Sequence, residues 1–402
     1  MTKFYTAFTT EIDDAEAAVR EICEQLNPQE NSLKNTIGIV YFYYEYVEMD
    51  ICRALADALP FELVGCVSTY VATKRQYADV ALSVTMITSD DAHFSVKTLE
   101  GLSTKSKEQI ADEITRTCAD FCALEVPKVV MPFLSPLPHF SGDELIAVAN
   151  ALPTPVPMFG TVAFNMETTE GNHFVIGSGK ISTSILAIVA VYGNVRPEYH
   201  ITSSFAFDEG IGDSAVITEA DGPVLKALNG ISAIEYLKKI GITTPENAVA
   251  GSGIWAVPAI LTYPNGAKVV RAFLGILEGT EYIFATGAMR EGAKVKFGYL
   301  NGEKTIASAK KLMNELKDKK ENDVLAYSCA ARAWSLGAKY FAEAQMLVKC
   351  AKEYEREHNV PFNYCVTYSG GEICPIYHDD GSFENCLHNY TFAACTFTKL
   401  ID

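Results

Sequence analysis

One order of elements recurs along the chain: an apolar strand, a helix, and then two further strands. The pattern is visible as apolar runs of strand length that alternate with segments whose apolar residues have helical spacing. Its three predicted copies use, in turn, residues 37–44, 48–58, 61–68 and 79–88; 128–135, 141–151, 156–163 and 184–193; and 323–330, 336–357, 362–369 and 390–398. Such a recurrence indicates copies of one supersecondary unit. A strand-helix-strand step favours parallel pairing and two consecutive strands can pair antiparallel, so the unit predicts mixed sheets flanked by helices.

The second strand of the first two copies carries glycine at the same place. Gly65 and Gly160 occupy matched positions in the runs 63–68 and 158–163. Because an interior glycine weakens a strand, its presence at both positions predicts that another backbone passes too close for a side chain. The third copy has Val366 at this position.

The repeated pattern is interrupted between its second and third copies. A turn-rich linker is expected around residues 193–212, followed by a helix near 231–240 and strands at 268–277 and 281–286. A chain of 402 residues also exceeds the usual size of one hydrophobic core. We therefore predict an α/β protein of two domains, residues 1–200 and 201–402, each with a mixed β-sheet flanked by helices and built from repeated strand-helix-strand-strand units.

The net charge restricts the class of partner. The formal charge is −17 at pH 7. Nucleic acids and anionic membranes attract basic surfaces, so we expect neither of them as the main partner.

The sequence also predicts where the protein resides. Its N-terminus lacks the apolar run of a signal peptide, and the longest strongly apolar run, residues 185–192, is far shorter than the roughly twenty residues that span a bilayer. Eleven cysteines, an odd number scattered through apolar segments, are typical of reduced core thiols. We expect a cytoplasmic protein.

Polar residues that could bind or react with a ligand lie at strand ends in the last copy. Cys329 and Arg332 follow one apolar strand, and Glu372 and His388 flank the edges of the next two. Ligands of α/β proteins bind at such rims, so the four side chains are expected to converge there. A guanidinium suits a carboxylate and a carboxylate suits an ammonium group, so Arg332 and Glu372 could hold the two ends of an amino acid. The alternative is that Arg332 and Glu372 only neutralise each other's charge inside the protein.

The same residues also allow an enzymatic hypothesis. Cys329 would be the nucleophile and His388 the base, with Glu372 or Asn389 orienting the imidazole. Cysteines at strand ends are, however, commonly buried and inert. Although cysteines and histidines crowd the last copy, none has the spacing of a metal motif, and we expect no metal and no cofactor.

Several runs of residues together resemble one family. Those in the C-terminal half are Val224-Leu225, Leu228-Asn229-Gly230, Val270 to Gly275, Glu291 to Val295, Ser328 to Arg332, Tyr368 to Ile373, and His388-Asn389 with Thr391; the N-terminal half contributes Leu63 to Thr69. With these runs the chain resembles the FIST family, bacterial sensory modules with paired N-terminal and C-terminal FIST domains. It departs from the family pattern at Val366 and Tyr70, where glycine is expected.

The resemblance implies a sensory protein that binds small ligands such as amino acids and signals through a separate partner protein. The candidate ligand-binding residues are Cys329, Arg332, Tyr368, Gly371, Glu372, His388 and Asn389. Two other functions remain open, a cysteine-dependent hydrolase or transferase and a protein-interaction scaffold without ligand. A pocket joining Arg332, Glu372 and His388 would favour sensing, a contact between Cys329 and His388 would favour catalysis, and a filled rim beside a large exposed apolar patch would favour a scaffold.

Overall fold

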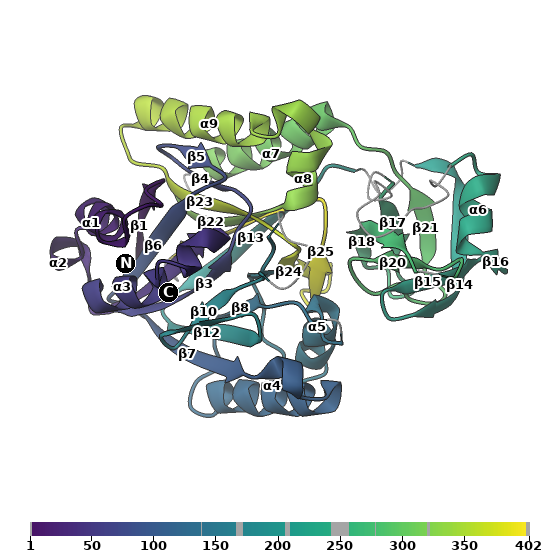
Figure 1. The fold of residues 1–402 in the computed structure, drawn as a ribbon, viewed down its shortest axis with the longest axis horizontal. Helices are drawn as coiled ribbons and strands as arrows, with labels where there is room; N and C mark the ends of the chain where they lie inside the picture. Colours follow the sequence, from purple (N-terminus) through teal and green to yellow (C-terminus); the bar gives the residue numbers. More distant parts are fainter. Residues whose placement is uncertain are drawn as a thin grey trace.

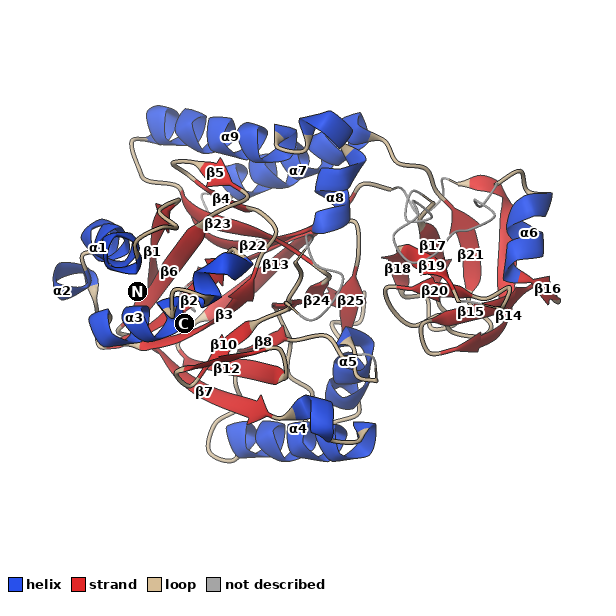
Figure 2. Ribbon diagram, in the orientation of Figure 1, coloured by secondary structure: helices blue, strands red, loops and turns tan. Residues whose placement is uncertain are grey.

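The chain forms four β-sheets with helices on their outer faces (Figures 1 and 2). The computed structural model describes residues 2–137, 139–165, 172–205, 210–242, 257–277, 279–319 and 322–398. Three six-stranded sheets make up a large body, and a fourth sheet forms a smaller lobe to one side of it. The predicted α/β class, with mixed sheets flanked by helices, is confirmed.

The first sheet has the strand order β1-β6-β2-β3-β10-β11. Its central pair, β2 and β3, is parallel, and every other pair is antiparallel. Helices α1 and α3 cover its outer face (Figure 1). The elements of this region are β1 (Thr2–Thr9), α1 (Ala15–Leu26), α2 (Pro28–Asn31), β2 (Asn35–Phe42), α3 (Ile51–Ala58), β3 (Glu62–Val67), β4 (Val71–Thr73), β5 (Tyr77–Ala78) and β6 (Leu82–Ser89).

The second sheet has the order β25-β24-β9-β8-β12-β7, with β8 and β9 as its parallel pair. Helices α4 and α5 lie outside it (Figure 1). A capping box begins α5, because Ser141 and Glu144 each bond the other's backbone N–H. The elements are β7 (Ala92–Glu100), α4 (Lys107–Cys122), β8 (Val129–Leu134), α5 (Gly142–Asn150), β9 (Gly160–Val162), β10 (Val175–Gly177), β11 (Lys180–Ser182) and β12 (Ile185–Gly193).

The third sheet has the order β13-β26-β22-β23-β4-β5, with β22 and β23 as its parallel pair. Helices α7 and α9 cover it (Figure 1). The elements are β13 (Arg196–Ser203), α7 (Gly302–Asp318), β22 (Asp323–Cys329), α8 (Ala330–Ser335), α9 (Ala342–His358), β23 (Asn363–Ser369), β24 (Glu372–Tyr377), β25 (Phe383–His388) and β26 (Thr391–Thr398).

The three sheets share one plan and exchange hairpins. In each sheet two parallel strands are followed by an antiparallel hairpin that belongs, in sequence, to a different sheet. Hairpin β4–β5 extends the third sheet, β10–β11 the first, and β24–β25 the second. Strands from both sides of residue 200 therefore share the second and third sheets, and the body is tied together across that position.

The smaller lobe is inserted between β13 and α7. Its eight strands pair antiparallel, and α6 packs on one side (Figure 1). We call it the inserted lobe, residues 210–297. Its elements are β14 (Ile211–Asp221), β15 (Val224–Leu228), β16 (Ile231–Ser232), α6 (Ala233–Lys239), β17 (Ala259–Thr262), β18 (Lys268–Arg271), β19 (Phe273–Ile276), β20 (Ile283–Ala285) and β21 (Lys294–Phe297).

Two predictions about the chain path are wrong. The last two strands of a unit were expected to pair antiparallel, but the last strand pairs with the first: β6 with β2, β12 with β8 and β26 with β22. The segment 193–212 was expected to be a turn-rich linker, but residues 196–203 form strand β13, which pairs along its whole length with β26. The segment was misleading because Pro197 and the flanking polar residues indicate a loop. β13 lies at the edge of its sheet, where proline and polar side chains are tolerated.

The paired glycines are explained by close backbone contact, as predicted. A Cβ at Gly65 would lie 1.8 Å from the carbonyl oxygen of Val40, and one at Gly160 would lie 2.1 Å from that of Pro132. Each contact joins the two parallel strands of a sheet. No side chain fits at either position.

The inner faces of the three sheets pack against one another around an aromatic core. Tyr41 of β2, Phe133 of β8 and Tyr327 of β22 are in contact, with ring centroids 6.5 and 6.3 Å from that of Tyr41. The Tyr41 hydroxyl donates a hydrogen bond of 3.0 Å to that of Tyr327, which satisfies the polar end of a buried ring. All eleven cysteines are free thiols.

Candidate functional site

Three chain segments meet where the parallel strands of the three sheets end. Residues 68–70 follow β3, residues 163–165 follow β9, and residues 370–371 follow β23. We call this meeting point the junction. Each segment leads into a hairpin that joins another sheet, so the segments must cross near the centre of the body. The carboxyl ends of parallel strands are where α/β proteins commonly bind ligands.

Hydrogen bonds fix the three segments to one another. The backbone N–H of Thr69 donates to the carbonyl of Tyr368 (3.3 Å), and its hydroxyl donates to the carbonyl of Phe164 (3.4 Å). The N–H of Gly370 donates to the carbonyl of Val162 (3.1 Å). The junction is therefore one bonded unit with a contribution from every sheet.

A half-buried aromatic group lies at the junction. The ring of Phe164 stacks on His173 with a centroid distance of 5.8 Å and meets Trp334 of α8 edge-on at 5.8 Å. The backbone N–H of Asn165 donates to Nδ1 of His173 (3.1 Å), which places the imidazole proton on Nε2, and burial lowers the pKa of this histidine. Gly370 lies against the Phe164 ring, because a Cβ there would come within 3.1 Å of the Phe164 Cβ.

Glu372 lies at the start of β24 and is completely buried. Its carboxyl oxygens accept hydrogen bonds from the hydroxyls of Ser369 (3.2 Å) and Thr391 (2.6 Å). Burial raises the pKa of this carboxyl to about 8, against the opposing effects of Thr391 and Arg332. Glu372 is therefore mainly protonated and uncharged at neutral pH.

Arg332 of α8 is also fully buried, but its carboxylate partner is Glu343 of α9. The guanidinium donates to Glu343 through Nε (3.1 Å) and Nη2 (2.5 Å). Its remaining bonds go to the hydroxyls of Ser204 (2.8 Å) and Ser308 (3.1 Å) and to the carbonyls of Thr305 (2.9 Å) and Tyr390 (3.3 Å). The donors of Arg332 are used inside the protein, and the ion pair that they form does not involve Glu372.

The surroundings of Cys329 and His388 oppose a catalytic role for either residue. Burial, followed by the nearby Glu372, raises the pKa of the Cys329 thiol far above its ordinary value. His388 bonds through Nε2 to the carbonyl of Cys374 (3.0 Å), and burial lowers its pKa to about 4. Within the described part of the chain no hydrogen bond joins Cys329 to His388, so the thiol has no base to activate it.

The other three predicted residues are structural parts of the junction. The carbonyl of Gly371 accepts from the N–H of Val162 (3.1 Å), and a Cβ on Gly371 would lie 2.9 Å from Leu387. Tyr368 is fully buried with its ring edge-on to Tyr70. Asn389 donates to the carbonyl of Gly370 (3.4 Å).

The inserted lobe is attached beside the junction by a buried arginine. Arg271 of β18 forms an ion pair of 3.0 Å with Asp143 of α5 and donates to the carbonyl of Leu387 (2.7 Å). In addition, Thr286 of the lobe donates to Asn389 Oδ1 (2.6 Å). We call these contacts, made by Arg271 and Thr286, the seam. They join the lobe to residues that lie next to the predicted site.

Sequence reasoning missed the aromatic group and the arginine of the seam. Phe164 directly follows the run 158–163, which was matched with 63–68, so extending that comparison by one residue would have placed it beside Thr69. Arg271 lies within a run that carries the family resemblance. No local pattern in the sequence distinguishes either of them as functional.

The described residues contain no group of three or more His, Cys, Asp or Glu side chains placed to hold a metal ion. None of the helices described is long and apolar enough to cross a membrane.

Comparison with known proteins now identifies the family. The FIST N domain model matches residues 36–231 and the FIST C domain model matches residues 233–375, so the two matches are nearly continuous. The chain belongs to the FIST family. FIST domains are sensory domains, which indicates a role in signal transduction. The boundary between the two FIST matches falls inside the inserted lobe, and the body contains parts of both.

Other comparisons add little. A search of curated proteins finds no match. Among solved structures, PurLQS from Thermotoga maritima is similar at 9% sequence identity over 99% of this chain and 72% of that chain, with a TM-score of 0.22. No structural or functional argument rests on a similarity of this size.

Proposed function

We propose that this FIST protein is a sensor whose small ligand, an amino-acid-like compound, binds at the junction. The observation that supports this most directly is the half-buried aromatic group of Phe164, His173 and Trp334 beside the backbone of Gly370. It lies at the carboxyl ends of the parallel strands and is the part of the junction that remains partly exposed. Binding sites combine apolar surface with a few fixed polar groups in this way.

The chemistry of the junction suits a small zwitterion. The faces of aromatic rings attract an ammonium group within about 6 Å of the ring centre. Two polar groups lie beside these rings. The Thr69 hydroxyl donates to the Phe164 carbonyl and keeps lone pairs that can accept a hydrogen bond, and the imidazole of His173 carries its N–H on Nε2. The net charge of −17 also favours a ligand that carries a cationic group over a simple anion.

In this proposal the predicted residues divide into two groups. Gly371 and Asn389 hold the crossing segments in place, and Arg332 and Glu372 lie in the buried layer that supports them. Because the donors of Arg332 are used by Glu343 and neighbouring oxygens, we assign it to positioning α8, and with it Trp334, and not to holding a ligand carboxylate.

A ligand screen tests the proposal. The chain has two tryptophans, so a Trp255→Phe background leaves Trp334 as the sole tryptophan reporter. Titration with the standard amino acids, their amine and acid analogues, and related metabolites should reveal a compound that changes Trp334 fluorescence. At a hundredfold excess over its dissociation constant, it should also add about 2.7 kcal/mol to the unfolding free energy.

Two variants control this screen. Phe164→Leu should abolish the response, because it removes the ring that contacts both His173 and Trp334. Phe383→Leu removes a half-buried ring at the outer end of the β24–β25 hairpin and should leave the response intact. A panel without any responding compound, or a response unchanged by Phe164→Leu, would refute binding at this position.

The hypothesis of a cysteine-dependent enzyme has no support from the geometry. The Cys329 thiol is buried beside a carboxyl group, which opposes thiolate formation. His388 is engaged by a backbone carbonyl.

A further inference from the structure

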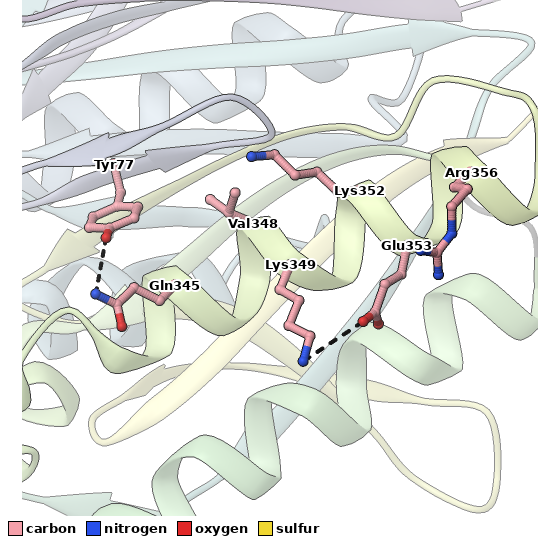
Figure 3. Close-up of a pocket in the computed structure, with 7 residues that line it drawn as sticks. All are labelled: Tyr77, Gln345, Val348, Lys349, Lys352, Glu353 and Arg356. Atoms are coloured by element: carbon pink, nitrogen blue, oxygen red, sulfur yellow. Dashed lines mark hydrogen bonds and ion pairs between the residues drawn. The ribbon is translucent and has the colours of Figure 1, made fainter.

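A groove on the outside of the third sheet has a composition unlike that of the chain as a whole. It runs along α9 beside hairpin β4–β5 and has a volume of about 560 Å³ (Figure 3). Its lining includes Tyr77 from the hairpin and Gln345, Lys349, Lys352, Glu353 and Arg356 from α9. Three cations and one carboxylate thus line one groove in a protein whose net charge is −17.

The sequence of α9 places these side chains in one row. Residues 345, 349, 352 and 356 are separated by four, three and four positions, so they share one face of the helix. The opposite face, with Ala344, Leu347 and Ala351, is buried against the sheet. The row is about 16 Å long at 1.5 Å per residue, which matches about five residues of an extended peptide.

Most of the positive charge in the groove is not neutralised. Lys349 is 3.9 Å from Glu353, and 76% of its side chain is exposed (Figure 3). In the described part of the chain neither Lys352 nor Arg356 has an ion-pair partner. Among the described residues, two of the three cations in the groove therefore lack an acidic partner.

The groove is partly apolar where the helix meets the hairpin. Gln345 donates a hydrogen bond of 3.0 Å to the Tyr77 hydroxyl, which links the helix to the hairpin (Figure 3). Tyr77 also packs on Phe341 with a centroid distance of 5.1 Å. A partly apolar groove with a cationic edge suits a chain that presents both carboxylates and an apolar side chain.

We propose that this groove docks an acidic peptide segment of a partner protein. Charge complementarity supports this occupant, and the open, elongated form of the groove suits a peptide better than a small anion. The two walls of the groove are hairpin β4–β5 and helix α9, and both begin near the junction. The hairpin directly follows residues 68–70, and the first turn of α9 contains Glu343, the partner of Arg332. The docking itself does not depend on the ligand proposed for the junction.

The test uses a fluorescein-labelled octapeptide of alternating glutamate and leucine, with a glutamine-leucine octapeptide as the neutral control. Fluorescence anisotropy with the full chain should show binding of the acidic peptide and little of the neutral one. The affinity should fall as salt is raised from about 50 to 300 mM, because exposed charges are then screened. Lys352→Glu with Arg356→Glu should weaken binding about tenfold or more.

A matched variant separates the groove from the bulk charge. Lys238→Glu with Lys239→Glu makes the same charge change on exposed residues of α6 in the inserted lobe, and binding should be unchanged. Equal loss of binding in both double variants, or equal binding of both peptides, would overturn the proposal. So would stronger competition by inorganic phosphate, oligouridylate or vesicles of anionic lipid than by unlabelled acidic peptide, since the groove would then recognise another kind of anion.

Discussion

Two buried arginines in this protein have similar surroundings and different consequences. Arg332 and Arg271 are 0% and 1% exposed, and each forms an ion pair with one carboxylate. The carboxylate of Arg332 is on α9, within the same sheet-helix layer of the body. That of Arg271 is on α5 of the body, whereas Arg271 itself belongs to the inserted lobe.

The difference lies in what each guanidinium joins. Arg332 bonds to the Thr305 and Tyr390 carbonyls and to Ser204, which all belong to α7 or to segments next to strands of the third sheet. Arg271 bonds on one side to Tyr263 of its own lobe and on the other to the Leu387 carbonyl of the body. Burial and pairing alone thus do not reveal the role of an arginine. Arg332 stabilises one layer, and Arg271 holds two parts of the molecule together.

The largest effect is expected from separating the Arg332 pair. Glu343→Gln would leave a buried guanidinium without a counter-charge, which costs about 3–5 kcal/mol of unfolding free energy. Urea denaturation followed by circular dichroism measures this loss. The double variant Arg332→Met with Glu343→Leu should recover most of it, because no buried charge remains. A loss below about 1 kcal/mol for Glu343→Gln would show that the pair does not hold this layer.

Separation of the Arg271 pair should act locally. Arg271→Met leaves Asp143 without its guanidinium partner and removes the bond to Leu387, at a cost of about 2–4 kcal/mol to the seam. Hydrogen exchange should become faster in β18 and β25, while the aromatic core around Tyr41 stays protected. Loss of protection throughout the body would mean that the two arginines have the same role.

A glycine offers a way to open the same seam without changing a charge. A Cβ at Gly287 would lie 2.1 Å from Asp143 Oδ2 and 2.7 Å from Arg271 Nε. Gly287→Ala should therefore reproduce the exchange pattern of Arg271→Met. Gly302→Ala, at the start of α7, is the control, because its nearest contact would be 3.1 Å from a flexible Leu336 side chain.

The pKa of Glu372 shows how far the charge of Arg332 acts beyond its ion pair with Glu343. The pKa of Glu372 is about 8 although Arg332 acts to lower it. An acid whose pKa is higher in the folded state than in the unfolded state contributes stability at low pH, and this contribution is lost as the pH rises toward the folded value. The unfolding free energy of the parent should therefore fall by about 2 kcal/mol between pH 6.5 and 8, relative to that of a Glu372→Gln variant.

Thermal denaturation of both proteins at several pH values measures this difference. The same two proteins should also be compared in a Glu343→Gln background. The uncompensated guanidinium of Arg332 should then lower the pKa of Glu372, so the fall in unfolding free energy should end at a lower pH. A stability difference between parent and Glu372→Gln that stays constant from pH 5 to 9 would show that Glu372 is not buried as a neutral acid.

Sequence alone was sufficient for the class of fold and for several elements. Continuous apolar runs located β2, β8, β12 and β22 within a few residues, because these strands are buried on both faces. The short hairpins were not recognised, and β13 was mistaken for a linker. Hairpin strands of two or three residues, such as β4 and β5, are too short to show a period, and the sheet that each one joins depends on contacts far away in sequence.

For the candidate site, the sequence grouped residues that the structure brings close together, but it did not predict their partners. Gly371, Glu372 and Asn389 were predicted as ligand-binding residues, and they lie in or beside the junction. The partner of Arg332 could not be predicted, because Glu343 and Glu372 are both carboxylates in the same repeat and only packing decides between them. Phe164 was missed because its contact with Trp334 joins residues 170 positions apart.

The smallest effect is expected from a third arginine on the same seam. Arg290 of the inserted lobe lies 3.9 Å from Glu384 of β25, with 41% of its side chain exposed, and its guanidinium is 4.3 Å from the centre of the Tyr263 ring. An exposed ion pair of this length contributes at most about 1 kcal/mol, because water screens both charges. Arg290→Met should thus leave hydrogen exchange in β18 and β25 nearly unchanged, although it removes the same charge from the same seam as Arg271→Met. If Arg290→Met and Arg271→Met increased hydrogen exchange in β18 and β25 equally, net charge and not burial would hold the inserted lobe to the body. Arg271 would then have no special role in joining the two parts of the molecule.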